Sequence, residues 1–468
     1  MGRGNFKAVL ATLCILSAGT FHNAAAQTHA LTGSVVIELH AGVITADLCL
    51  TDPPAQNDTV RFLLNRGFNI KRIRSDSGAV VSYDSGSDTN DDIKYAVRHN
   101  GRICIEYVGA FPVYNVASGD YRDSDGSSVI AFNGMTLRAR GETRWYPVPY
   151  DAANNQTQDE LTYRIHVSCA ECHYLYINGA APHSGPEADL SSDVARELLI
   201  YSGNYPLQEI PDGRIIGETV TADTARMFFA QLREIEDFYA DYLGVPYGPR
   251  PDILRIIPAR KDRRGQFWGF FSDPALGLVG LTIGDFVHIL ADKSEPARPM
   301  VLGVLAHELG HRYFPHVLAP GGAYFQLFSE PFANYLDLKA TLHFYGDSAY
   351  AARVHKLAEP LRAGADLPAL DRVDTQTLAS DAYRYHYAPL LLLSLERAIG
   401  EARMRRLMRL MLTAPASERA NASYALIHTA ALRAGVEQDV WKKWEEDCLR
   451  PAFSKNSCLA TLASSGDR

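Results

Sequence analysis

Residues 301–311, with the sequence VLGVLAHELGH, decide the expected fold and chemistry. The mostly apolar run predicts a buried helix, and His307 and His311 lie four residues apart on it. Side chains at that spacing share one face of a helix, so both imidazoles can bind the same metal ion. Glu308 lies beside them, where its carboxylate can take a proton from a metal-bound water. The motif predicts a hydrolytic zinc site on a helix that ends at Pro315.

Glu330 is the predicted third ligand of this site. Eighteen residues separate it from His311, and it opens the segment EPFANYL at 330–336, which reads as the start of a second helix. Two histidines and one carboxylate fill three of the four positions around zinc and leave one open for water. The alternative for Glu330 is a first-turn acid favoured by the helix dipole. Asn334, one turn later, is predicted to hold a ligand imidazole by its second nitrogen.

These two segments resemble the gluzincin metallopeptidases of the aminopeptidase N and leukotriene hydrolase type. Those proteins read HELxHxWF and then NEGFAxY, and this chain reads HELGHRYF at 307–314 and SEPFANY at 329–335. Weaker matches at 105–109, 144–147 and 163–167 carry the likeness into the first half of the chain. The resemblance implies a zinc peptidase of the aminopeptidase kind with one bound Zn²⁺.

The same resemblance implies an oxyanion donor. In the family, the Tyr of a Tyr-x-Lys-Gly pattern donates a hydrogen bond to the tetrahedral intermediate, and this chain reads YHYA at 385–388 in a similar place. Tyr385 is therefore the predicted donor. Because the Lys and Gly neighbours are not kept, Tyr383 and Tyr387 remain alternatives.

One departure from the family concerns how the substrate is held. There, a Gly-x-Met-Glu-Asn strand precedes the zinc helix, and its Glu anchors the free amino group of the substrate. With Gly277 aligned to the glycine that follows that strand, Pro274 falls at the Glu position and Asp273 is offset by one residue. We expect the strand of Gly277 and Leu278 to line the substrate cleft by backbone hydrogen bonding. Without the anchor, an endopeptidase or a specialised peptide hydrolase on the same scaffold is the alternative function.

Changes of pattern along the chain predict two domains in an α+β protein. Short alternating segments broken by turn residues favour a β-sandwich-like domain over residues 27–185. The turn-rich residues 183–187 mark its end. Beyond them, apolar residues at helical spacing between a Thr221 cap and Gly244 predict a long amphipathic helix. By resemblance, residues 186–468 form a thermolysin-like mixed α/β catalytic domain with a short helical C-terminal tail.

The first 26 residues (1–26) read as an export signal. Arg3 and Lys7 precede an apolar run at 8–21, and the small residues 24–26 offer a cleavage site. That run is shorter than the roughly 18 to 20 apolar residues that a membrane helix needs. We therefore expect cleavage, export to a periplasm or to the outside medium, and no stable membrane span.

Six cysteines follow the predicted signal, an even number that suits a compartment in which disulfides form. Six cysteines allow about 15 connectivities. Chain order suggests one of them: Cys49 with Cys104, Cys169 with Cys172, and Cys448 with Cys458. Residues 169–173, CAECH, also match the attachment pattern of a c-type haem, which is an alternative interpretation of this pair.

Composition limits the partners of the chain. The 46 Lys and Arg against 54 Asp and Glu give a net charge of −8, and the bases are not concentrated as nucleic-acid binding requires. The predicted partner is a peptide or protein substrate, with no nucleic acid. A non-catalytic binding module is a further alternative, which the complete set of ligands, base and tyrosine opposes.

Overall fold

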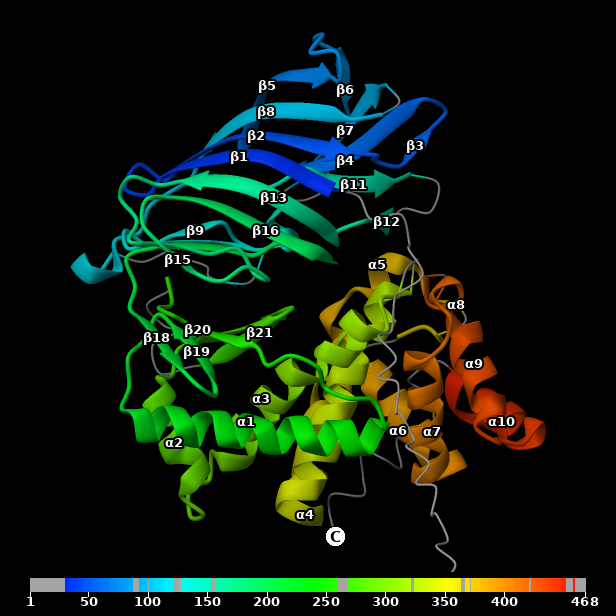
Figure 1. The fold of residues 1–468 in the computed structure, drawn as a ribbon. Helices are drawn as coiled ribbons and strands as arrows, with labels where there is room; N and C mark the ends of the chain where they lie inside the picture. Colours follow the sequence, from blue (N-terminus) through cyan, green and yellow to red (C-terminus); the bar gives the residue numbers. More distant parts are fainter. Residues whose placement is uncertain are drawn as a thin grey trace, which may run out of the picture.

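The computed structural model describes residues 30–451 and Cys458, except residues 87–91, 100, 121–125, 127, 153–155, 260–266, 321–323, 363–366, 371 and 421. The predicted export signal lies outside the described residues. Within them, strands dominate the first half of the chain and helices dominate the second (Figure 1). This division gives the predicted mixture of a β-rich N-terminal part and a largely helical C-terminal part.

The first sheet has the strand order β16-β13-β1-β2-β8-β5. Along β13, buried side chains alternate with more exposed ones, because one face of the sheet packs on the core. The strands are β1 (Ala30–Glu38), β2 (Val43–Thr51), β5 (Phe68–Ser75), β8 (Ile103–Ala110), β13 (Leu161–Ser168) and β16 (Glu187–Arg196).

Two further sheets complete the β-rich half. One joins β12-β11-β4-β7-β6, with β3 beside β4, and the other joins β15-β14-β17-β10-β9. All three sheets contribute to one core around Trp145 and Tyr107, whose hydroxyl donates to the Trp145 backbone oxygen at 2.8 Å. The strands are β3 (Ala55–Gln56), β4 (Thr59–Asn65), β6 (Tyr83–Ser85), β7 (Asp92–Arg98), β9 (Ala131–Phe132), β10 (Thr136–Ala139), β11 (Val148–Asp151), β12 (Gln156–Thr157), β14 (Tyr174–Leu175), β15 (His183–Ser184) and β17 (Ile200–Gly203).

Strand pairing carries the β-rich half past the division predicted at residue 185. β16 pairs with β13, and β17 pairs with β10, so both belong to the sheets formed by the first half of the chain. Residues 185 and 186 connect β15 and β16, which follow one another in the chain but belong to different sheets.

A fourth sheet, with the order β18-β19-β20-β22-β21, opens the second half. Helix α1 (Ala222–Leu243) confirms the predicted amphipathic helix: Thr221 caps it through the backbone N–H of Thr224, and Gly244 ends it with a left-handed φ of 64°. The strands are β18 (Leu207–Ile210), β19 (Gly213–Ile216), β20 (Asp252–Ile256), β21 (Trp268–Ser272) and β22 (Ala275–Val279).

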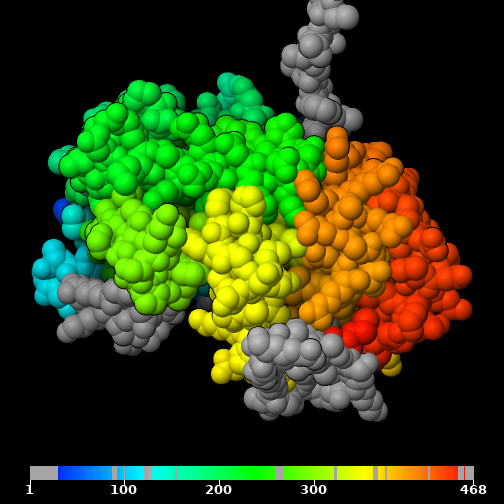
Figure 2. Space-filling view, turned by 90° about the horizontal axis from the view of Figure 1, so that it is seen from below, coloured from blue at the N-terminus to red at the C-terminus, as the bar shows by residue number. Residues whose placement is uncertain are grey.

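The rest of the described chain is helical and shares one large core with α1. The helices are α2 (Ile283–Ala291), α3 (Arg298–Gly310), α4 (Glu330–Arg362), α5 (Thr375–Leu378), α6 (Ala388–Ile399), α7 (Glu401–Leu412), α8 (Ala416–Ala420), α9 (Tyr424–Arg433) and α10 (Gln438–Trp444). Seen from below, α1 in green, α4 in yellow and the C-terminal helices in orange and red lie side by side (Figure 2). Among the described residues, no helix has the length and apolar content to cross a membrane.

Three disulfides join the cysteines in the pairs suggested by chain order: Cys49 with Cys104, Cys169 with Cys172, and Cys448 with Cys458. The first links β2 to β8, and the last fixes Cys458 to the end of the helical half. Because the sulfurs of Cys169 and Cys172 are bonded to each other, they are not available for thioether bonds to a haem.

Candidate metal centre

Helix α3 carries the first part of the site. Its apolar side chains, among them Leu305 and Leu309, are buried in the core of the helical half, and proline stands in its first turn. The helix lies in contact with both α4 and β21. It ends at Gly310, five residues before the predicted Pro315, because the chain continues as a π-helical segment, Arg312–Val317.

The imidazoles of His307 and His311 and the carboxylate of Glu330 converge on one point. Nε2 of His307 lies 3.1 Å, and Nε2 of His311 3.5 Å, from Oε2 of Glu330. Ligand atoms at zinc's bond lengths of about 2.0–2.2 Å stand about 3.3–3.6 Å apart in a tetrahedron. Oε2 of Glu330 is buried without a hydrogen bond of good geometry. This donor set therefore fits a zinc ion, and three ligands fill three of the four positions that zinc usually has.

The outer nitrogen of His311 is held by Phe314. Nδ1 of His311 lies 3.0 Å from the backbone oxygen of Phe314, so Nε2 is directed at Glu330. Nδ2 of Asn334, the predicted partner, donates to the backbone oxygen of Glu330 at 3.0 Å. This hydrogen bond lies within the first turn of α4, and the contact of Asn334 with a ligand imidazole stays a prediction.

Glu308 is the buried carboxylate beside the two imidazoles. Burial raises the pKa of Glu308, whereas the nearby His307 and His311 lower it. The balance leaves the pKa above its ordinary value, which suits a residue that must accept a proton. Gly269 of β21 packs directly against the Glu308 side chain. Glu308 therefore lies between the metal ligands and the edge strand of the fourth sheet.

Of the three candidate tyrosines, the structure brings Tyr385 to the metal ligands. Its ring centroid lies 6.5 Å from that of His307, and burial followed by the charge of Glu330 raises the pKa of Tyr385. Tyr383 and Tyr387 are fully buried and pack against each other, with ring centroids 4.9 Å apart. The π-helical segment Ala382–Tyr387 produces this division, because it turns Tyr385 away from its two neighbours.

The strand that borders the site is β21. β22 has both of its edges paired, one with β20 and the other with β21. Gly277 and Leu278 lie on β22, so their backbone groups are already bonded inside the sheet. This corrects the expectation that their strand binds substrate through its backbone. Within the described part of the chain, β21 forms the edge of this sheet.

Asp273, the residue next to the position of the expected amine anchor, is held in an ion-pair network. Its carboxylate accepts a hydrogen bond from Arg312 and lies 3.4 Å from NH1 of Arg196. Its backbone oxygen accepts from Asn178 at 2.8 Å. Pro274 follows in the tight turn between β21 and β22. Neither residue presents a carboxylate that is available to a substrate amine.

Three groups near the site are not predicted by any sequence motif: Gly269, Phe314 and Arg140. Gly269 lies in an aromatic-rich run, and a glycine inside such a strand pattern signals close approach of another group. Phe314 acts through its backbone oxygen, which leaves no signature in sequence. Arg140 comes from the β-rich half and contacts Ser272, which is 132 residues away.

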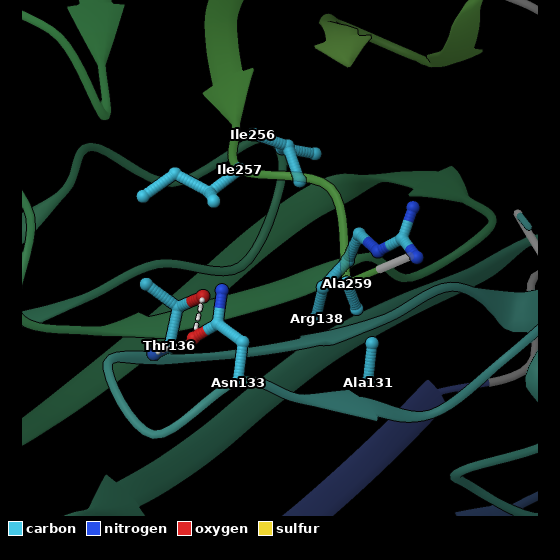
Figure 3. Close-up of a pocket in the computed structure, with 7 residues that line it drawn as sticks. All are labelled: Ala131, Asn133, Thr136, Arg138, Ile256, Ile257 and Ala259. Carbon is cyan, nitrogen blue, oxygen red and sulfur yellow. Dashed lines mark hydrogen bonds between the residues drawn. The ribbon is translucent and has the colours of Figure 1, made fainter. Parts of the chain in front are cut away.

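A separate pocket lies where the third sheet meets the end of β20. Figure 3 shows Arg138, Asn133 and Thr136 on one side of it and Ile256 and Ile257 on the other. The hydroxyl of Thr136 donates to Oδ1 of Asn133 at 3.1 Å. None of the residues that line this pocket is a metal ligand.

Comparisons with known proteins show likeness in structure. No family model matches the sequence, and no curated protein matches it. The structure of native yeast LTA4 hydrolase matches with a TM-score of 0.63 and 11% identity, over 89% of this chain and 67% of that one. The M1 zinc metallopeptidase from Deinococcus radiodurans matches with a TM-score of 0.54 and 15% identity, over 91% and 93% of the two chains.

An E323A mutant of the Deinococcus radiodurans metallopeptidase is also similar, with a TM-score of 0.58 and 14% identity over 90% of this chain and 94% of that one. Identities this low establish the likeness of fold. The chain therefore has the fold of the M1 zinc metallopeptidases and of LTA4 hydrolase, and it contains a group of two histidines and one glutamate able to bind a metal ion.

Proposed function

We propose that this chain is a zinc-dependent peptidase that hydrolyses peptide bonds with an activated water, and that it is aminopeptidase-like. The observation that carries the proposal is the convergence of His307, His311 and Glu330 beside a buried Glu308. The fold likeness to zinc metallopeptidases supports it independently.

Glu308 and Tyr385 take the two catalytic roles of the chain. A zinc ion bound by the three ligands supplies Lewis acidity, which lowers the pKa of a water and polarises the carbonyl under attack. Glu308 accepts the proton of the attacking water and passes it to the leaving amine. Tyr385 donates a hydrogen bond from its hydroxyl group to the carbonyl oxygen as negative charge develops there.

The edge strand β21 is the proposed binding strand for the substrate backbone. An edge strand has N–H and C=O groups that an extended peptide can pair with. Gly269 brings this edge against Glu308, so a peptide paired with β21 would pass the proton-transfer group. The free-amine anchor of the resembled family has no counterpart at Asp273 or Pro274, and an endopeptidase on the same scaffold is therefore the second candidate function.

Location and domain organisation are part of the same proposal. Residues 1–26 act as a cleaved export signal, and the protein works in a periplasm or outside the cell. Three disulfides support an oxidising compartment. We assign residues 27–185 to a β-sandwich-like domain and residues 186–468 to a thermolysin-like catalytic domain, except that β16 and β17 pair with strands of the first domain.

A matched peptide pair tests the proposal. Two peptides that differ only in a free or an acetylated N-terminus are incubated with zinc-loaded protein, and the products are identified by mass spectrometry. Cleavage by the wild type and none by a zinc-loaded Glu308→Gln variant is expected. Stepwise removal of single residues from the free peptide alone supports an aminopeptidase, and internal cleavage of both supports an endopeptidase. If neither peptide is cleaved, the proposed function is contradicted.

A further inference from the structure

A buried guanidinium group from the β-rich half is packed along the strand that borders the candidate metal centre. Arg140 follows β10 and is almost fully buried, with 7% of its surface exposed. Its Nε donates to Oγ of Ser272 at 3.0 Å, and NH2 donates to the backbone oxygen of Phe271 at 3.3 Å. Its Cζ also lies 4.8 Å from the ring centroid of Phe270. Arg140 is therefore packed along β21, the strand that touches Glu308.

The charge of Arg140 belongs to the electrostatic environment of the metal centre. Burial lowers the pKa of this guanidinium, and the carboxylates of Glu142 and Glu197 oppose that effect. The carboxylates of Glu308 and Glu330 also raise the pKa of Arg140. The cation therefore interacts with the general base and with a metal ligand, although it comes from the β-rich half of the chain.

The carboxylates nearest to Arg140 do not use all the hydrogen-bond donors of its guanidinium group. Oε2 of Glu142 lies 3.6 Å from NH1, and Oε2 of Glu197 lies 3.8 Å from NH2. Hydrogen bonds between guanidinium and carboxylate groups are about 2.7–2.9 Å long and frequently use two nitrogens at once. A buried arginine with such long contacts retains donor capacity for one more anionic group.

At the end of β21, the residues next to Arg140 offer no free carboxylate to a cation. Ser272 is neutral and fully buried, and Asp273 is already bound by Arg196 and Arg312. A substrate ammonium group next to Ser272 would lie beside the Arg140 guanidinium and be repelled by it. A carboxylate in the same position would be attracted and could accept hydrogen bonds.

We propose that Arg140 binds a carboxylate of the substrate on the side of the scissile bond that lies along Ser272, so that the enzyme selects acidic peptides. This inference rests on the proposed peptidase function and specifies its substrate class. It makes Arg140 a specificity-determining residue, with Ser272 as a positioning residue that fixes the guanidinium. Selectivity comes from charge, since the guanidinium attracts a glutamate side chain and repels a lysine side chain.

The test uses tetrapeptides in which Glu, Gln or Lys occupies each position in turn, each made once with a free and once with an acetylated N-terminus. With the wild type, we expect cleavage next to Glu and a KM lower than for the Gln peptide by about tenfold to a hundredfold, the effect of one hydrogen bond between charged groups. Arg140→Gln should remove this difference, whereas Arg140→Lys should keep part of it. Equal preference for Glu in Arg140→Gln and in the wild type would overturn the inference.

Arg144→Gln provides a matched control, because Arg144 is a buried guanidinium of the same segment that pairs with Asp159 at 3.1 Å. It should keep the preference for Glu. If Arg140 only fastens the β-rich half to β21, Arg140→Gln should lower kcat for all three peptides alike and leave their ratio unchanged, which would contradict the proposal.

Calorimetry on zinc-loaded Glu308→Gln separates this inference from the proposed function. Peptides with Glu should bind more tightly than those with Lys, and adding Arg140→Gln should abolish the difference. If no peptide is cleaved by the wild type but this difference in binding is found, the peptidase function fails and the anion site stands. If peptides are cleaved without a charge preference, the peptidase stands and the anion site fails.

Discussion

A Cβ atom on Gly269 would lie 2.6 Å from Cγ of Glu308. The edge strand β21 and the side chain of the proposed base are therefore in direct contact, with no space for even a methyl group between them. This contact explains why a glycine stands in a strand that is otherwise rich in aromatic residues. It also joins two functions, because the strand proposed to bind the substrate backbone sets the position of the group that moves the proton.

Gly269→Ala should therefore impair catalysis without removing the metal. The added methyl group must displace either β21 or Glu308, and a misplacement of about 1 Å at a catalytic group costs on the order of 100-fold in rate. We expect kcat to fall by about that factor while bound zinc, measured by atomic emission, stays at one ion per chain. Gly284→Ala is the control, because the nearest atom to its new Cβ is Oγ1 of Thr282 at 3.6 Å. An unchanged kcat in Gly269→Ala would contradict the contact.

Tyr385→Phe should lower kcat by about 100-fold to 1,000-fold, the effect of losing one donor to the oxyanion. KM should change little, because the hydroxyl bonds to the substrate oxygen mainly in the transition state. Tyr383→Phe is the matched control from the same segment: its ring is buried against Tyr387, away from the ligands. A larger loss of kcat in the control than in Tyr385→Phe would show that Tyr385 is not the oxyanion donor.

The convergence of the three candidate metal ligands could be predicted from sequence because their geometry is local. His307 and His311 are one helical turn apart, and Glu330 opens the next long helix, so their spacing along the chain determines how they meet. The same holds for α1, whose ends follow from a threonine cap and a glycine.

The substrate side of the site depends on contacts that are remote in sequence. Whether β21 or β22 forms the sheet edge is decided by the pairing of β22 with β20, and a one-dimensional pattern does not contain the order of strands. Arg140 reaches Ser272 only because the β-rich half packs on the fourth sheet. The boundary at residue 185 has the same origin, since a turn signal does not indicate which sheet the next strand joins.

Glu330→Gln should weaken zinc binding by more than the 10-fold to 100-fold that is typical for loss of an outer partner of a ligand. The amide has no negative charge to offset the metal, and the two imidazoles alone leave the coordination incomplete. Competition with a chelator of known affinity measures the change. Asn334→Ala is the informative comparison, because Nδ2 of Asn334 donates to the backbone oxygen of Glu330 and not to its carboxylate. A drop in affinity in Asn334→Ala as large as in Glu330→Gln would contradict this placement.

Glu236 should make the stability of the fold depend on pH independently of the metal centre. It lies on α1 with 6% of its surface exposed, Oε1 has no hydrogen-bond partner, and Nε of Arg250 is 4.0 Å from Oε2. Burial raises the pKa of Glu236 to about 7, and Arg250 only partly offsets it.

Because this pKa exceeds the ordinary value of 4.5 in the unfolded chain, the folded state holds the proton more tightly. The stabilisation from protonated Glu236 is fully present below about pH 4.5 and is lost as pH rises to about 7. Glu236→Gln imitates the protonated form, so it should raise the free energy of unfolding at pH 8 by at most about 3 kcal/mol and change it little at pH 4.5. Urea denaturation at both values measures the difference. Glu234→Gln, at an exposed position of the same helix, should have no such dependence, and an equal effect of Glu236→Gln at the two pH values would show that Glu236 is not the titrating group.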